Sequence, residues 1–167
     1  SPYIESDSPR IVRLAAENFS AEIPAWQRVE AIFDWVRENV EYRFDETIRT
    51  CLEALDAGVG DCEELSSLFV ALCRALGIPA RAVWIPGHTY PEFLLANAQG
   101  ELHWYPCQVA GAGHDFGRMP EPKPILQKGD RFRVPGERML QRYLKPTLTA
   151  QDATGTPELK WILEPVV

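Results

Sequence analysis

Cys62 is the residue of this 167-residue sequence that is best placed to act as a nucleophile. It follows Gly58-Val59-Gly60-Asp61, a glycine-rich turn, and a helical pattern of apolar residues begins directly after it. Asp61 suits the N-cap of this helix, and Glu64 can complete a capping box. Cys62 is then the first helical residue, close to unpaired backbone N–H groups and the positive end of the helix dipole. Both features favour the thiolate, which is the nucleophilic form of cysteine.

His88 is the best candidate for a base that could serve this thiol. It opens a segment, 88–96, whose side chains alternate as in a strand, and Glu92 shares its face. Residues 97–100 predict a tight turn, so the returning strand runs antiparallel to the first. Such a hairpin brings Gln108 beside His88. An amide oxygen at that place can accept a hydrogen bond from the imidazole and fix the orientation of the ring.

The other three cysteines are expected to be structural. Cys73 lies on the apolar stripe of the helix that begins at Cys62, and Cys51 falls in a short helical segment. By strand alternation, Cys107 points away from the strand face expected for the site. One disulfide among Cys51, Cys73 and Cys107 is the alternative that the sequence leaves open. The sequence has no C-x-x-C pair, and no further ligands cluster around Cys62 and His88, which argues against a metal site.

Helices are expected around Cys62, and strands after them. The helix that begins at Cys62 ends at Gly77-Ile78-Pro79, where glycine suits the left-handed position and proline blocks continuation. Pro91 cannot donate a ladder hydrogen bond, so its strand must be an edge there or carry a bulge. The other expected helices span 9–19, 24–40, 50–57 and, more weakly patterned, 138–144. The expected strands span 81–85, 88–96 and 101–106, with further strands near 131–134 and 159–163.

Helices followed by mostly antiparallel strands predict an α+β fold, and 167 residues suit a single domain, 1–167. The composition, 46% hydrophobic and 25% charged, is that of a globular protein. The net charge of −7 and the lack of a basic run make nucleic acid and anionic membranes poor partners. No apolar run approaches the roughly 20 residues of a membrane span. The glycine- and proline-containing stretch 110–130 either walls a groove near the thiol or wraps the surface.

Three segments together resemble the transglutaminase-like superfamily, in particular its bacterial-type domains. Gly60-Asp61-Cys62 and the helix after it resemble the nucleophile helix of that family. The segment from His88 to Phe93 is similar to its histidine strand, usually His-Ala-Trp-x-Glu. Trp104-Tyr105-Pro106-Cys107-Gln108 resembles its Trp-x-Pro-x-Asp element. The three segments occur in the family's order, so the resemblance covers a core of about 24–108 and leaves 109–167 as a C-terminal extension.

The resemblance implies a papain-like fold, in which N-terminal helices and a central nucleophile helix pack on an antiparallel sheet. It implies that Cys62 is the nucleophile and His88 the base, with Gln108 where the family usually has aspartate. The implied reaction is thiol-dependent acyl transfer on peptide or amide substrates. Hydrolysis, as by a cysteine protease or amidase, is expected over transamidation, because water outcompetes an amine unless the site excludes it. Because Gln108 carries no negative charge, a catalytically weak or inactive binding module stays open as the alternative.

Four further residues could support such a site. Tyr42 is a candidate second donor to an oxyanion, beside the backbone N–H of the nucleophile. Asp61 could tune the site in addition to capping the helix. Glu92 could orient or bind a group, or be an ordinary charge at a strand edge, and Trp104 could pack beside the histidine.

The resemblance implies no metal and no organic cofactor, and it implies a peptide or protein as the substrate partner. It leaves the oligomeric state open. Bacterial members of such families often form parts of longer secreted or envelope proteins, so we expect, as a mild preference, a secreted or cell-envelope location.

Overall fold

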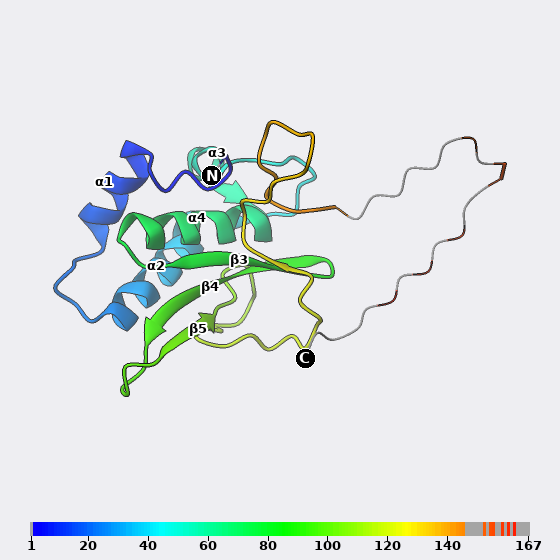
Figure 1. Cartoon of the computed structure of the whole chain (residues 1–167). Coiled ribbons are helices and arrows are strands. Elements are labelled where there is room, and N and C mark those ends of the chain that lie inside the picture. Colours follow the sequence, from blue (N-terminus) through cyan, green and yellow to red (C-terminus); the bar gives the residue numbers. More distant parts are fainter. Residues whose placement is uncertain are drawn as a thin grey trace.

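The chain places its helices before the strands of its main sheet, as the sequence predicts. The computed structural model describes residues 2–145 and also residues 152, 154, 155, 158, 160 and 162. Figure 1 shows the helices gathered on one side of the sheet, which confirms the α+β class. In chain order the elements are α1 (Pro9–Asn18), α2 (Ala25–Asn39), β1 (Glu41–Tyr42), α3 (Cys51–Ala57), β2 (Val59–Gly60), α4 (Cys62–Ala75), β3 (Ala80–Ile85), β4 (His88–Ala96), β5 (Leu102–Pro106) and β6 (Gln127–Lys128).

Helix α4 is the centre of the molecule and contacts α1, α2 and α3 as well as strands β3 and β4. Its residues from Glu64 to Cys73 are all buried, and the ring of Phe69 lies 6.2 Å from that of Phe93 on β4. Full burial of such a side chain contributes about 1.5–3 kcal/mol. The helix ends as predicted, because Gly77 is left-handed with φ of 75° and the N–H of Ile78 donates to the carbonyl of Cys73 over 2.9 Å.

The shorter helices also begin and end where local chemistry predicts. Ser8 caps α1 by accepting a hydrogen bond from the N–H of Arg10, and a proline follows at the first turn. Thr50 and Glu53 form a capping box at the start of α3, and Gly58 ends that helix with φ of 66°. Helix α2 follows Pro24 and buries the apolar face that its spacing indicates. No helix in the described part of the chain is long and apolar enough to cross a membrane.

The main sheet is antiparallel, with strand order β5-β4-β3-β6. Pairing of β4 with β5 starts at Glu92 opposite Pro106, so Pro91 lies just past the end of that ladder. The carbonyl of Pro91 accepts from the N–H of Cys107 over 3.0 Å, which places the nitrogen of Pro91 on the same side. The missing donor of Pro91 therefore falls at the end of the ladder between β4 and β5, where no further strand pair needs it.

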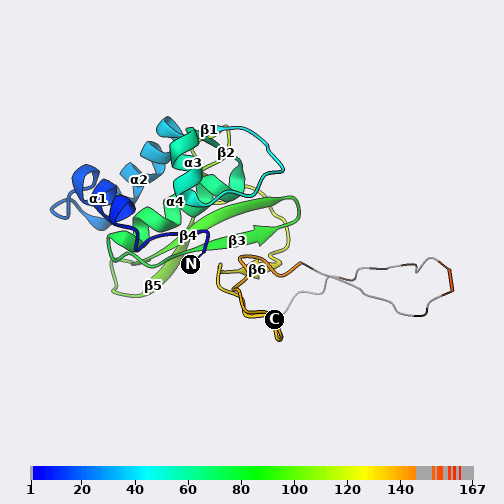
Figure 2. The ribbon, with the colours of Figure 1, turned by 90° about the horizontal axis from the view of Figure 1, so that it is seen from above.

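The predictions after residue 124 are less successful. Only one bridge, between Phe132 and Gln141, forms where a strand over 131–134 is expected, and the fourth strand of the sheet is β6 instead. No helix forms over 138–144, where Met139 is 66% exposed and finds no apolar surface to cover. Figure 2 shows this segment beside β6 at the β3 edge of the sheet. The strand expected over 159–163 lies mostly outside the described residues.

Candidate active site

A cavity of about 390 Å³ lies at the N-terminal end of α4, and both Cys62 and His88 line it. Each is the first residue of its element, α4 and β4 respectively. The two elements are held together nearby, because the hydroxyl of Ser66 donates to the carbonyl of Thr89 over 3.2 Å. The remaining walls come from the end of β3 and from segments before α3 and after β6, the latter including Tyr143. The structure thus brings the two residues singled out as nucleophile and base to one cavity.

The glycine-rich turn before Cys62 has a steric cause. Strand β2 pairs in parallel with β1, with Gly60 opposite Tyr42, and then turns directly into α4. A Cβ at Gly60 would lie 2.7 Å from the Cβ of Glu64, which is closer than real Cβ contacts. Asp61 and Glu64 form the predicted capping box, with bonds of 2.7 Å from the N–H of Glu63 to Asp61 and 3.0 Å from the N–H of Asp61 to Glu64.

The thiol of Cys62 is partly buried, and this burial is the main cause that raises its pKa, to about 12. The negative charges of Asp61 and Glu63 raise the pKa further, while a backbone hydrogen bond from Thr89 acts in the opposite direction. The expectation of a resting thiolate is therefore wrong. Loss of water and two neighbouring carboxylates outweigh the helix terminus, so the thiol keeps its proton at neutral pH.

His88 and Gln108 are in direct contact, as the hairpin argument predicts. The Nε2 atom of His88 lies 2.7 Å from the Oε1 atom of Gln108, whose side chain is buried. An amide oxygen can only accept hydrogen bonds, so Nε2 carries the proton in this pair. In the neutral ring, Nδ1 is then the unprotonated nitrogen, free to accept a proton from a thiol.

Two residues that position Gln108 escape sequence reasoning. The guanidinium of Arg37, on α2, donates to the carbonyls of Gln108 and Gly111 over 3.1 and 2.7 Å. A Cβ at Gly111 would overlap the Cγ atom of Gln108, so only glycine leaves room for that side chain. The glycine-rich composition after Gln108 was the only signal for this contact, whereas nothing in the sequence connects Arg37 to it.

The stretch 110–130 serves both functions considered for it. Its first part wraps α2, where the ring of His114 bonds to Asp34 over 2.9 Å and the ring of Phe116 lies 5.4 Å from that of Phe33. Leu126, near the other end, lines the cavity that holds Cys62. The glycine-rich part is thus a surface wrap, and only the end next to β6 forms a wall of the cavity.

Of the four supporting candidates, Tyr42 and Asp61 line the cavity. Tyr42 is 51% exposed. Its pKa is raised by burial, by a thiolate at Cys62 where that group ionises, and by the charge of Asp61, so its hydroxyl keeps a proton that it can donate. Asp61 takes part through its carboxylate, which caps α4 and also raises the pKa of the thiol.

Glu92 and Trp104 are held elsewhere. The carboxylate of Glu92 is buried and accepts hydrogen bonds from Arg81, over 2.7 and 2.9 Å, and from Lys128, over 2.9 and 3.1 Å. Trp104 pairs with Leu94 on β4, and the Arg81 guanidinium lies 3.8 Å from the centre of its ring. The expectation that Trp104 packs beside the histidine is wrong, because Arg81 occupies its face. Glu92 belongs to a charge cluster that joins β3, β4 and β6 rather than to the cavity.

All four cysteines are free, so no disulfide joins Cys51, Cys73 and Cys107. These three are buried, and burial raises the pKa of each thiol above its ordinary value. The described residues contain no group of three or more histidine, cysteine or acidic side chains that could hold a metal ion.

We expect alkylation of Cys62 by iodoacetamide to accelerate about tenfold per pH unit between pH 6 and 9. The sign follows from the raised pKa of Cys62, because the reactive thiolate fraction keeps growing until the pH approaches about 12. Labelling mapped by mass spectrometry should also be faster at Cys62 than at the three buried cysteines. The urea-unfolded chain is the control, since its thiols titrate near their ordinary pKa. A rate at Cys62 that is already constant between pH 6 and 8 would contradict a neutral resting thiol.

The site can be set beside known proteins. The chain is similar to a solved structure from Cytophaga hutchinsonii, a protein proposed to be a cysteine protease, with 26% identity and a TM-score of 0.50 over 66% of this chain and 39% of that one. A protein from Parabacteroides distasonis ATCC 8503 that is proposed to be a protease is 14% identical, with a TM-score of 0.48 over 67% and 28%. The chain thus spans well under half the length of either protein. A comparison with curated proteins found no match.

The family comparison covers the elements that carry the site. The model of the transglutaminase-like superfamily matches residues 13–109, a range that runs from α1 to just past Gln108 and includes Cys62 and His88. This range is more than half of the 167 residues. The chain therefore belongs to the transglutaminase-like superfamily.

Proposed function

We propose that this chain hydrolyses amide bonds of a peptide or protein, with Cys62 as nucleophile, His88 as base and Gln108 as the residue that orients the base. The observation that carries the proposal is the 2.7 Å bond between His88 and Gln108, made by a ring that lines the same cavity as Cys62. Membership of the transglutaminase-like superfamily supports a thiol enzyme, and the similarity to the Cytophaga protein supports peptide substrates.

The steps follow from the protonation states. As the sulfur of Cys62 attacks the amide carbonyl, its proton passes to Nδ1 of His88 and a tetrahedral intermediate forms. Collapse of this intermediate breaks the C–N bond, and the imidazolium gives its proton to the leaving amine. Water, deprotonated by the same nitrogen, then attacks the thioester and releases the acid and the thiol. Gln108 keeps Nε2 protonated throughout, which leaves Nδ1 to carry each proton.

Donors for the oxyanion lie at the start of α4. The backbone N–H of Cys62 belongs to the first turn of the helix, whose N–H groups have no acceptor within the helix. Tyr42 lines the same cavity, and its hydroxyl is a candidate second donor. Charge that develops on the carbonyl oxygen is thereby placed near the positive end of the helix dipole.

Hydrolysis is favoured over transfer to an amine. Tyr42 and Phe44 line the cavity and are 51% and 73% exposed, so its rim faces solvent on this side. When the parent protein processes a peptide ester or amide together with a millimolar primary amine, we expect the free acid to exceed the amine adduct at least about tenfold. Mass spectrometry of both products measures this ratio, with the amine omitted as control. An adduct that exceeds the acid would assign the chain to transamidation.

One observation favours a second candidate, a binding module without turnover. The pKa of Cys62, raised to about 12, makes its thiol a weaker nucleophile than the ion pair of an activated cysteine enzyme. Hydrolysis assays of the parent protein and of a Cys62 variant, together with a measurement of peptide binding, separate the two candidates. Turnover that depends on Cys62 supports the hydrolase, whereas peptide binding without any turnover supports the binding module.

A further inference from the structure

The segment between β1 and α3 holds two large apolar side chains in water. Phe44 is 73% exposed, and Ile48, four residues later, is 53% exposed. Within the described part of the chain, the ring of Phe44 meets no other aromatic ring and no cation. Phe44 nevertheless lies in the wall of the cavity that contains Cys62 and His88. Its ring is therefore apolar surface that a ligand of this cavity can cover.

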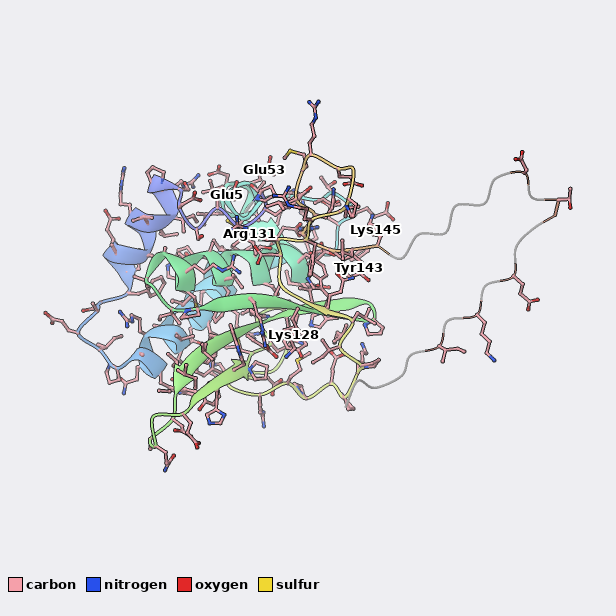
Figure 3. All side chains as sticks on the ribbon, viewed as in Figure 1. Glu5, Glu53, Lys128, Arg131, Tyr143 and Lys145 are labelled. Carbon is pink, nitrogen blue, oxygen red and sulfur yellow. The ribbon has the colours of Figure 1, made fainter. Side chains whose placement is uncertain are left out.

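Other parts of the same wall are also apolar, but there the side chains are held by neighbours. Tyr143, on the segment after β6, and Trp84, on β3, both line the cavity, and their ring centres lie 4.9 Å apart. Figure 3 shows Tyr143 beside the beginning of α4. Ile85 and Leu126 add aliphatic surface. Phe44 is the most exposed of the apolar residues in this wall, so it has the most area left to bury.

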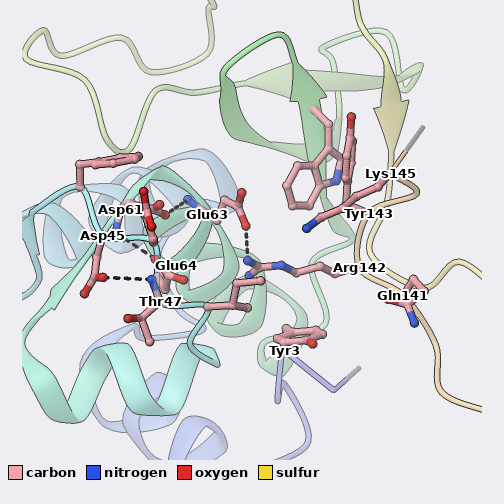
Figure 4. A pocket seen from close by; sticks show the side chains of 14 residues that line it. Tyr3, Asp45, Thr47, Asp61, Glu63, Glu64, Gln141, Arg142, Tyr143 and Lys145 are labelled. Carbon is pink, nitrogen blue, oxygen red and sulfur yellow. Dashed lines mark hydrogen bonds and ion pairs between the residues drawn. The ribbon is translucent and has the colours of Figure 1, made fainter. Parts of the chain in front are cut away.

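The carboxylates of the cavity already have partners within the protein. Asp61 accepts from the N–H of Glu63 over 2.7 Å as the cap of α4. Glu63 forms an ion pair with Arg142, which Figure 4 marks. Burial raises the pKa of Glu63, while the charges of Arg142 and Lys145 lower it. Neither carboxylate needs a cation from a substrate, so an apolar side chain fits this cavity better than a charged one.

We propose that Phe44 is a specificity-determining residue, whose ring packs on a large apolar side chain of the peptide next to the bond that is cleaved. The inference rests on the proposed function, because it takes the substrate of Cys62 to be a peptide. It narrows that substrate to peptides with an aromatic or branched aliphatic residue beside the cleaved bond. The gain comes from removing two apolar surfaces from water at once, in proportion to the area that is covered.

Binding tests the assignment without depending on turnover. Acetylated and amidated alanine hexapeptides that carry a single Phe, Leu, Lys or Glu are titrated, with NMR detection, into the Cys62→Ala protein and into Cys62→Ala/Phe44→Ala. The uniform alanine host lets each peptide slide until its one large side chain meets the ring. We expect the Phe and Leu peptides to bind Cys62→Ala about tenfold more tightly than the all-alanine peptide. Phe44→Ala should remove most of this advantage, and Phe44→Leu should retain much of it.

Leu102→Ala in the same background is the matched control, because Leu102 is 68% exposed on β5 and does not line the cavity. It should leave every affinity unchanged. Thermal unfolding of each variant checks that the fold is intact, as expected for side chains that lie mostly in water. An equal loss for all peptides after Phe44→Ala, or equal affinity of all peptides for the Cys62→Ala protein, would overturn the assignment. Tightest binding of the Lys or Glu peptide would do the same, since a charged group would then select the substrate.

The two proposals can fail separately. If the Phe and Leu peptides bind with the expected preference but the parent protein never cleaves them, the proposed hydrolysis fails and the role of Phe44 stands. If the parent protein cleaves peptides through Cys62 with no preference that depends on Phe44, the role of Phe44 fails and the hydrolysis stands.

Discussion

Cys62→Ala is expected to remove peptide hydrolysis, with a loss of at least about 10³-fold in kcat/KM. In the proposed mechanism Cys62 supplies the attacking atom, and the methyl group of alanine cannot act as a nucleophile. Alanine fills most of the volume of the thiol at the first turn of α4, so the helix and its cap at Asp61 should persist. The loss is therefore chemical, and peptide affinity should change little.

Hydrolysis of a peptide library, followed by mass spectrometry, measures this effect. Cys51→Ala is the matched control, because it removes another thiol, one that is buried beneath the N-terminal segment and bonded to Glu5 rather than facing the cavity. It should retain turnover. Hydrolysis by Cys62→Ala at the parent rate would remove Cys62 from the mechanism.

Gln108→Ala is expected to lower kcat about 10²-fold while leaving KM nearly unchanged. Without the amide oxygen, nothing at that place holds Nε2 of His88 protonated and the ring oriented, as the 2.7 Å bond does. Gln108→Asp should retain or raise turnover, because a carboxylate accepts the same bond and also stabilises the imidazolium. The contrast between the two variants separates orientation of the base from mere packing of the buried side chain.

Gly111→Ala sharpens this test, since it leaves the amide present but takes the space that its side chain occupies. Alone, it should lower kcat by displacing Gln108 from His88. Added to Gln108→Ala, it should have little further effect, because the contact is already gone. Steady-state kinetics of the four proteins measure the cycle. If Gln108→Ala is as active as the parent, the assignment of the third catalytic residue is incorrect.

Local signals explain why the core of the fold could be predicted. The caps at Asp61 and Gly77 depend only on neighbouring residues, and they fix where α4 begins and ends. The contact of His88 with Gln108 follows from strand alternation and a tight turn, which are also local. Such features place the candidate nucleophile and base without knowledge of distant contacts.

Properties that depend on distant contacts escaped prediction. The pKa of Cys62 is set mainly by burial, which no short stretch of sequence specifies. Arg37 supports Gln108 from a position 71 residues earlier in the chain. The segment after β6 follows no helical or strand period, because side-chain contacts such as the bond from Trp84 Nε1 to the carbonyl of Gly129, 2.9 Å long, decide its course.

One further contact closes the segment after β6 into a loop. The side-chain amide of Gln127 bonds to Leu144 twice, donating to its carbonyl over 2.6 Å and accepting from its N–H over 2.9 Å. The two ends of the intervening loop, which carries Arg142, thus meet at one fixed point. The entropic cost of closing such a loop grows only slowly with its length. A change of length within this loop would therefore cost little free energy, provided that the bonds between Gln127 and Leu144 at its two ends are kept.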